Sequence, residues 1–171
     1  MKEYIFDKKD SGIVGKAFEM AVKDALNRKN ADKVSPCGCA DFRWHNKNYD
    51  TKQNGSTIKY GNSAKYIKGS NRVIYATHVA HTVVAETEKE ITITIDLANT
   101  EMFVLDRMEF VNYLLDNNCA KLNVSRRTVN IQTMWNYKED KYHGRKPIVL
   151  EKWAYEHDLG DDIIGAILEG L

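Results

Sequence analysis

Hydrophobic residues near the start of the chain recur with the period of an α-helix. The stripe consists of Val14, Ala17, Phe18, Ala21, Val22, Ala25 and Leu26. A stripe of this kind covers one face of a helix and leaves polar residues on the other face. The pattern therefore predicts an amphipathic helix from Ser11 to about Asn30.

Four later segments have the character of β-strands. Ala40–Trp44 and Tyr49–Gln53 flank the turn-rich Asn46–Asn48, so we expect them to pair as a short hairpin. Arg72–Val79 is an apolar run that is typical of a buried strand. Glu90–Asp96 alternates apolar and polar residues, which indicates a strand that is buried on one face.

The segment after the hairpin, Asn54–Asn71, is polar and rich in Gly, Ser, Asn and Lys, and it predicts a long loop. Leu105–Leu115 predicts a second helix with Asp106 at its N-cap.

In the C-terminal third, the hydrophobic pattern does not distinguish strands from short helices. Leu122–Thr133 and Ile148–His157 each suit a strand or a short helix, and Asp161–Leu168 suits a helical turn. The order of elements predicts one domain, residues 1–171, of the α/β (α+β) class. We expect a central mixed β-sheet flanked by helices.

Charge is unevenly distributed, although the whole chain carries a net charge of only +1. Residues 41–72 hold seven Lys or Arg and two Asp, and residues 121–146 hold seven Lys or Arg against two acids. The tail from Pro147 onward holds six acids and one lysine. Such segregation suits a basic face for a polyanion, although charge blocks are also common on ordinary solvated surfaces.

The three cysteines, Cys37, Cys39 and Cys119, are an odd number, which argues against a secreted disulfide framework. Their spacing also lacks the paired pattern of structural zinc sites, so reduced thiols are favoured. No apolar run has membrane-span length and no signal-peptide core is present. We therefore expect a cytoplasmic protein that does not contact the membrane.

Asp41, Asp50 and Lys52 form the most informative polar group in the sequence. Asp50 and Lys52 are two positions apart, so on a strand they face the same side. The predicted hairpin would bring Asp41 to the same point, and Glu19 on the preceding helix offers a further carboxylate. The alternative is that Asp50 and Lys52 form a solvated ion pair on an edge strand.

This group has the donors that phosphodiester hydrolysis needs. Carboxylate oxygens and the backbone carbonyl of Thr51 are hard ligands for Mg²⁺ or Mn²⁺. A bound metal lowers the pKa of water and neutralises charge on the phosphate. The ammonium of Lys52 could orient the water and stabilise the oxyanion.

In its order and spacing this pattern resembles the PD-(D/E)xK nuclease superfamily, which includes type II restriction endonucleases and archaeal Holliday junction resolvases. The segment 15–22 matches the first helix of the family, with its glutamate behind an aromatic residue. Ala40-Asp41 stands where the family has Pro-Asp, and Asp50-Thr51-Lys52 stands where it has (Asp/Glu)-x-Lys. Ala40 is a departure from the family's proline. The resemblance covers about the first 80 residues and the helix at 105–115.

The resemblance implies a restriction endonuclease-like αβββαβ core and a site for Mg²⁺ or Mn²⁺. Asp41 and Asp50 would be metal ligands, Glu19 an auxiliary ligand, and Lys52 the catalytic lysine. Residues expected to contact nucleic acid, from the resemblance and from the basic segments, are Gln53, Arg43, Lys59, Lys65, Lys68, Arg126, Arg127, Lys141, Arg145 and Lys146.

The sequence thus favours an enzyme, a Mg²⁺-dependent deoxyribonuclease of restriction, junction-resolving or phage-encoded type. DNA is the expected partner, and a homodimer would match the two scissile phosphates of a duplex. The alternative is a non-catalytic nucleic-acid-binding or defence-inhibitor protein on the same scaffold.

Overall fold

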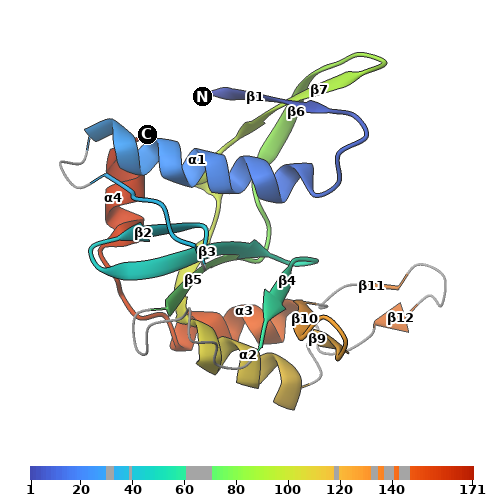
Figure 1. Cartoon of the computed structure of the whole chain (residues 1–171), viewed down its shortest axis with the longest axis vertical. Coiled ribbons are helices and arrows are strands. Elements are labelled where there is room, and N and C mark those ends of the chain that lie inside the picture. The colour runs from blue at the N-terminus through green and yellow to red at the C-terminus, as the bar shows by residue number, and fades with distance from the viewer. Residues whose placement is uncertain are drawn as a thin grey trace.

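A computed structural model describes residues 1–29, 33–38, 40–60, 71–117, 120–131, 135–136, 141–142 and 147–171. In these residues, four β-sheets, one of them only two-stranded, and four α-helices form a layered α+β fold (Figure 1). The helices are α1 (Ile13–Lys29), α2 (Arg107–Asp116), α3 (Pro147–Glu156) and α4 (Ile163–Glu169). The predicted fold class, with a mixed central sheet flanked by helices, is confirmed.

The central sheet has the strand order β2-β3-β5-β8. Its strands are β2 (Phe42–Trp44), β3 (Lys47–Gln53), β5 (Asn71–Ala76) and β8 (Met102–Asp106). β3 and β5 are parallel, whereas the β2-β3 and β5-β8 pairs are antiparallel. The predicted β2-β3 hairpin is confirmed, and so is the buried strand β5.

The turn of the hairpin lies one position earlier than the sequence predicts. It consists of His45 and Asn46, with φ angles of 47° and 62°, while Lys47 already belongs to β3. Positive φ at both central residues is typical of the two-residue turns whose twist matches that of paired strands. Asparagine tolerates this conformation, which explains why the turn forms here.

Side chains of the central sheet alternate between two hydrophobic clusters, one on each face. In β5, Ile74 belongs to the first cluster, with α1 and α4, whereas Val73 and Tyr75 belong to the second, with α2 and α3. In β8, Val104 and Leu105 divide in the same way. Because both faces are covered there, β5 and β8 contain continuous apolar runs, at residues 73–76 and 102–105.

α1 confirms the predicted first helix, and its apolar stripe faces the first cluster. Phe18, Val22 and Leu26 are almost completely buried. The helix lies between the central sheet and a second sheet of order β1-β7-β6, as Figure 1 shows. Near its C-terminal end, α1 also contacts α4, where Gly170 approaches so closely that a Cβ atom would overlap the backbone of Ala25.

The second sheet consists of β1 (Glu3–Asp7), β7 (Glu90–Ile95) and β6 (His81–Glu86). β7 confirms the half-buried strand that alternation predicts. β1 and β6 have no clear sequence pattern, and every residue of β6 is exposed. A β-bulge interrupts the pairing of β6 with β7 at Val84.

The third sheet has the order β4-β10-β9; it corrects one prediction and settles one open choice. Its strands are β4 (Thr57–Lys59), β10 (Thr128–Ile131) and β9 (Ala120–Asn123). β4 lies within the predicted loop, so that prediction is wrong for part of its length, and residues 61–70 lie outside the described ones. β9 and β10 decide the open choice for the segment 122–133 in favour of strands joined by a turn, while its residues 132 and 133 lie outside the described ones. β11 (Trp135–Asn136) and β12 (Lys141–Tyr142) form a separate pair.

The second helix begins two residues later than predicted, because Leu105 still belongs to β8. Asp106 is the N-cap, and its side chain accepts a hydrogen bond from the backbone N–H of Glu109. The open segment near 148–157 is helical, as α3, and the predicted C-terminal turn is α4. Just before α4, Asp161 accepts a hydrogen bond from the hydroxyl of Tyr49, which ties this end of the chain to β3.

The order of elements differs from the αβββαβ core in one respect. α2 follows five strands after β3, and the strands after α2 join the third sheet or the β11-β12 pair rather than the central sheet. The restriction endonuclease-like core thus remains a prediction. None of the helices in the described part of the chain combines the length and apolar character needed to cross a membrane.

The packing of α1 generates a stability prediction. Phe18 is 1% exposed in the first cluster, so Phe18→Ala should lower the free energy of unfolding by about 3–5 kcal/mol, through lost burial and a cavity. Met20 on the same helix is 41% exposed, and Met20→Ala should change it by less than about 0.5 kcal/mol. Urea denaturation followed by circular dichroism measures both, and equal losses would show that α1 does not pack as described.

Candidate functional site

Asp41 lies immediately before β2, at the open edge of β3. β2 has three residues and β3 has seven, so the ladder between them ends at the Phe42–Tyr49 pair. Asp41 Oδ2 accepts hydrogen bonds from the backbone N–H and the hydroxyl of Thr51, at 2.8 and 3.1 Å. A carboxylate therefore takes the place of a backbone partner at this edge.

The geometry of the strand also places a carbonyl oxygen here. In an extended strand the N–H and C=O of one residue point toward the same neighbouring strand. The N–H of Thr51 points toward Asp41, so the carbonyl of Thr51 faces the same open edge.

Asp50 and Lys52 lie on one face of β3, as the sequence predicts. In the register of the sheet, Asp50 lies beside Val73 and Lys52 beside Tyr75, and both β5 residues belong to the second cluster. Asp50 is only 8% exposed. Burial raises the pKa of Asp50 to about 6, with a further rise from the charge of Asp41, while the cation of Lys52 acts in the opposite direction.

Glu19 reaches Asp41 from the other side of the sheet, because α1 packs on the first cluster. Burial raises the pKa of Glu19 to about 7, and the protonated carboxyl shares a hydrogen bond with Asp41. The negative charge of Asp41 raises it further, and Lys23, 3.6 Å away, acts against this rise. The structure thus joins Glu19 to Asp41, and Asp41 to Asp50, but leaves Glu19 and Asp50 on opposite faces of β3.

The ammonium of Lys52 donates a hydrogen bond to the backbone carbonyl of Thr57, at 2.8 Å. Thr57 is the first residue of β4, so this contact joins the end of β3 to the third sheet. The position of Lys52 is therefore fixed both by the strand that carries it and by the strand that follows.

Arg107 is a residue of this site that the sequence argument missed. It is 1% exposed, and its Nη1 donates a hydrogen bond to the carbonyl of Lys59 at 2.7 Å. Its positive charge also lowers the pKa of Asp50, against the larger effect of burial. One signal was available, because a cation in the first turn of a helix is unfavourable to the helix dipole and requires a specific partner.

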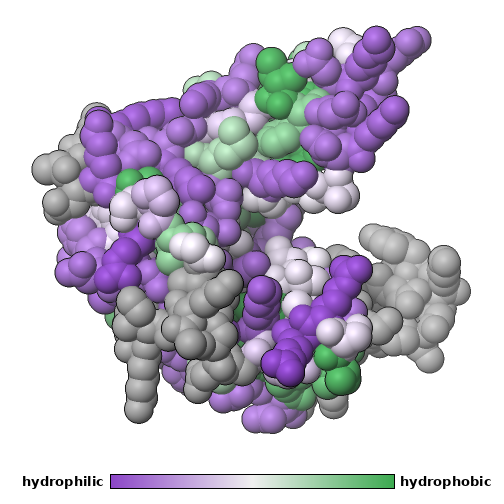
Figure 2. All heavy atoms as spheres, in the orientation of Figure 1, coloured by the Kyte–Doolittle hydropathy of each residue, from purple (hydrophilic) through white to green (hydrophobic). Residues whose placement is uncertain are grey.

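An open groove borders the third sheet and has a volume of about 600 Å³. Its lining residues are mostly polar: Thr57, Leu122, Asn123, Val124, Ser125, Arg126, Thr128 and Asn130. Thr57 lines this groove, and its backbone carbonyl accepts the hydrogen bond from Lys52. Figure 2 also shows a hollow between the β1-β7-β6 sheet and the part that holds the β4-β10-β9 sheet, but no residue of the β1-β7-β6 sheet lines the groove.

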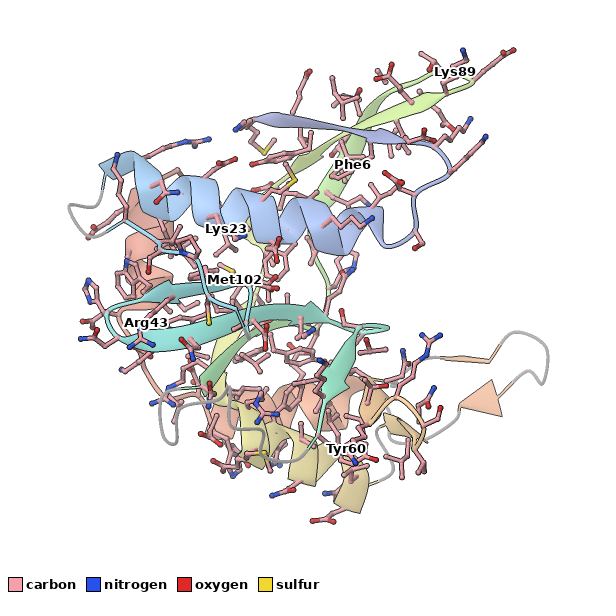
Figure 3. The ribbon with its side chains drawn as sticks, viewed as in Figure 1. Phe6, Lys23, Arg43, Tyr60, Lys89 and Met102 are labelled. Atoms are coloured by element: carbon pink, nitrogen blue, oxygen red, sulfur yellow. The ribbon has the colours of Figure 1, made fainter. Side chains whose placement is uncertain are left out.

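The other residues that the sequence predicts to contact nucleic acid lie in different parts of the structure. Arg126, Arg127 and Lys59 are exposed on or beside the third sheet. Gln53 lies at the end of β3 against Gly15 of α1. Arg43 is separate from this group: Figure 3 shows it near the turn end of the β2-β3 hairpin, where it donates to Asn48. The remaining predicted contacts lie outside the described residues or side chains: Lys65, Lys68, Lys141, Arg145 and Lys146.

The donor chemistry of Asp41, Asp50 and the Thr51 carbonyl fits a hard divalent cation such as Mg²⁺ or Mn²⁺. Burial and mutual repulsion oppose the charge on Asp50, and a cation would relieve both effects. Within the described residues, no three His, Cys, Asp or Glu side chains are grouped closely enough to hold one ion. The set would thus be completed by the backbone and by water rather than by a third acidic side chain.

Comparison with known proteins identified no similar protein. No protein-family model matches the chain, and no curated protein or solved structure matches it.

The raised pKa of Glu19 generates a prediction about stability and pH. Its pKa rises from 4.5 to about 7 on folding, so the folded protein binds more protons than the unfolded chain between these values. The free energy of unfolding should therefore fall as pH rises through this window, and Glu19→Gln should make that fall smaller. Urea denaturation in EDTA, from about pH 4 to about pH 8, measures the difference between the two proteins.

The matched control for this experiment is Glu88→Gln, at an exposed position beside the turn that joins β6 and β7. It should follow the pH dependence of the wild type. A Glu19→Gln variant that kept the full wild-type pH dependence would contradict the described contact between Glu19 and Asp41.

Proposed function

We propose that this protein is a divalent-metal-dependent endonuclease that hydrolyses DNA phosphodiester bonds. The observation that carries the proposal is the meeting of Asp41, Asp50 and Lys52 at the open end of β3, beside a polar groove. The resemblance to the PD-(D/E)xK superfamily assigns the same three residues to metal binding and catalysis. Geometry and motif therefore support the same function.

Asp41 and Asp50 would hold the metal, with the carbonyl of Thr51 as a third oxygen donor. When bound, a divalent metal stabilises the negative charge that develops on the phosphate and makes water a stronger acid. The hydrogen bonds from Thr51 fix the carboxylate of Asp41 at the edge of the sheet. Glu19 supports that carboxylate from the opposite face and would tune its charge rather than bind the metal itself.

Lys52 would act on the scissile phosphate. An ammonium group has three N–H donors, and the contact with Thr57 uses one of them. The others remain to donate to a phosphate oxygen or to orient the attacking water. Hydrogen-bond donors that are fixed in place before the reaction stabilise developing charge without the cost of reorganisation.

The groove next to Lys52 suits a nucleic-acid strand on either side of the scissile bond. Arg126 offers a guanidinium, which can bind a phosphate through two parallel hydrogen bonds. Thr57 and Thr128 contribute hydroxyl groups, which commonly contact the sugar-phosphate backbone. These contacts are independent of base identity and position the strand in the site.

A second candidate function is a protein that binds nucleic acid, or inhibits a defence complex, without cleavage. The observation in its favour is that Lys52 is held by a backbone carbonyl. Such a protein would show salt-dependent binding and no metal-dependent cleavage.

The decisive prediction concerns cleavage. With Mg²⁺ or Mn²⁺, the wild type should nick or cut DNA, and Asp50→Asn and Lys52→Ala should each reduce the rate at least about a hundredfold, because each removes a group that stabilises the transition state. The measurement is the conversion of supercoiled plasmid and of labelled oligonucleotides. Matched controls are Asp116→Asn and Lys89→Ala, which change exposed residues far from β3 and should keep full activity.

Thermal unfolding separates the two candidate functions when no cleavage is seen. A metal that binds the folded state raises the thermal midpoint. Mn²⁺ should therefore stabilise the wild type and fail to stabilise Asp41→Asn or Asp50→Asn. If the wild type shows no cleavage and no stabilisation by metal, the nuclease proposal is contradicted.

DNA binding by the groove is tested separately. Arg126→Ala should weaken binding to DNA and reduce the slope of log K against log salt by about one, because one phosphate contact is lost. Fluorescence anisotropy over a salt series, with Asp50→Asn as the background to prevent cleavage, measures both quantities. The control is Arg43→Ala, at the other end of the hairpin, and an equal effect of the two substitutions would show that the groove is not the binding surface.

A further inference from the structure

β6 forms one edge of the β1-β7-β6 sheet, and all six of its residues, His81–Glu86, are exposed. Its pairing in the described part of the chain is with β7 alone, so its other side presents unpaired backbone groups. Such an edge pairs readily with another strand, and proteins usually protect it with Lys, Pro or a covering segment. β6 contains neither Lys nor Pro.

The sequence of β6 is complementary to itself when two copies run antiparallel. A two-fold axis between Val83 and Val84 places His81 of one copy opposite Glu86 of the other. A ring N–H of His81 can donate a hydrogen bond to the carboxylate of Glu86 across the two strands, and such cross-strand side-chain pairs stabilise the pairing. The two central valines, 48% and 46% exposed, would cover each other's side chains at the axis.

Contacts within the chain leave this pairing open. Glu86 Oε1 lies 2.7 Å from the ammonium of Lys8, and the second carboxylate oxygen can accept from a histidine of another copy. His81 Nδ1 contacts the carbonyl of Val79 at 2.8 Å, which leaves Nε2 for the partner. Both residues can therefore keep their present contacts.

The β-bulge at Val84 is compatible with the same symmetry. A bulge increases the local twist of a strand, and a flat partner would fit it poorly. A second copy of β6 has the same bulge, and the two-fold axis brings the two bulges together, so their twists match. The hairpin of β6 and β7 also projects beyond the end of α1, with Lys89 at its tip, so another molecule can approach it (Figures 1 and 3).

We propose that β6 pairs antiparallel with β6 of a second copy of this chain, which gives a two-fold dimer with one continuous six-stranded sheet. Two-fold interfaces are self-complementary by definition, and β6 meets that condition in its hydrogen-bonding side chains and in the position of its bulge. A single strand pair is small compared with stable interfaces of standard size. The dimer is therefore concentration-dependent.

Sedimentation velocity and light scattering of the full chain, without DNA and metal, test this proposal. The wild type should shift from monomer to dimer as its concentration rises. Val84→Glu places two glutamates beside the axis and should raise the dissociation constant about tenfold or more, whereas the control Val84→Ile should keep the dimer. A wild type that stays monomeric, or a Val84→Glu variant that dimerises as the wild type does, would overturn the proposal.

A charge reversal gives an independent test of the register. His81→Glu should weaken the dimer because two glutamates then face each other, and adding Glu86→Lys should restore it by creating a new opposite-charge pair. Circular dichroism and thermal unfolding of each variant verify that the monomer is folded. Equal dimerisation of the wild type and both variants would exclude this register.

Discussion

The site depends on the difference in length between two paired strands. β2 is shorter than β3, so the last residues of β3 have no strand on one side, and their backbone groups need other partners. The carboxylate of Asp41 supplies the partner for Thr51. A polar edge is thereby kept open in a sheet whose two faces are otherwise buried. The same interaction draws an acid toward Asp50, so one hydrogen bond serves both the fold and the proposed chemistry.

The position of Asp41 in the plane of the sheet gives the two faces different roles. On one face, Asp50 and Lys52 lie near the groove, and Arg107 supports them from α2. On the other face, Glu19 shares a hydrogen bond with Asp41 and does not contact Asp50. Protonation of Glu19 would therefore change the electrostatic environment of Asp41, although Glu19 itself lies outside the proposed metal site. This separation explains how three acids can coexist here although two of them are largely removed from water.

The sequence predicted those elements whose hydrophobic period was unambiguous. α1, β5 and β7 each bury a regular pattern, and the hairpin with its two acids and lysine follows from alternation around a turn. β6 was missed because none of its residues is buried, and β8 was partly assigned to α2 because a fully buried strand has no period. Arg107 escaped because its partner, the carbonyl of Lys59, is a backbone group that no side-chain motif can reveal.

The contact between α1 and α4 has a consequence for how the chain folds. Gly170 touches Ala25, and the first hydrophobic cluster includes residues from both ends of the chain. Contacts between distant positions must close a long loop before they contribute, which slows folding and makes it cooperative. During synthesis, α1 therefore remains partly uncovered until α4 has left the ribosome. The edge that carries Asp41 rests on this same cluster, so the site would mature only after α4 has packed, later than the hairpin that carries its residues.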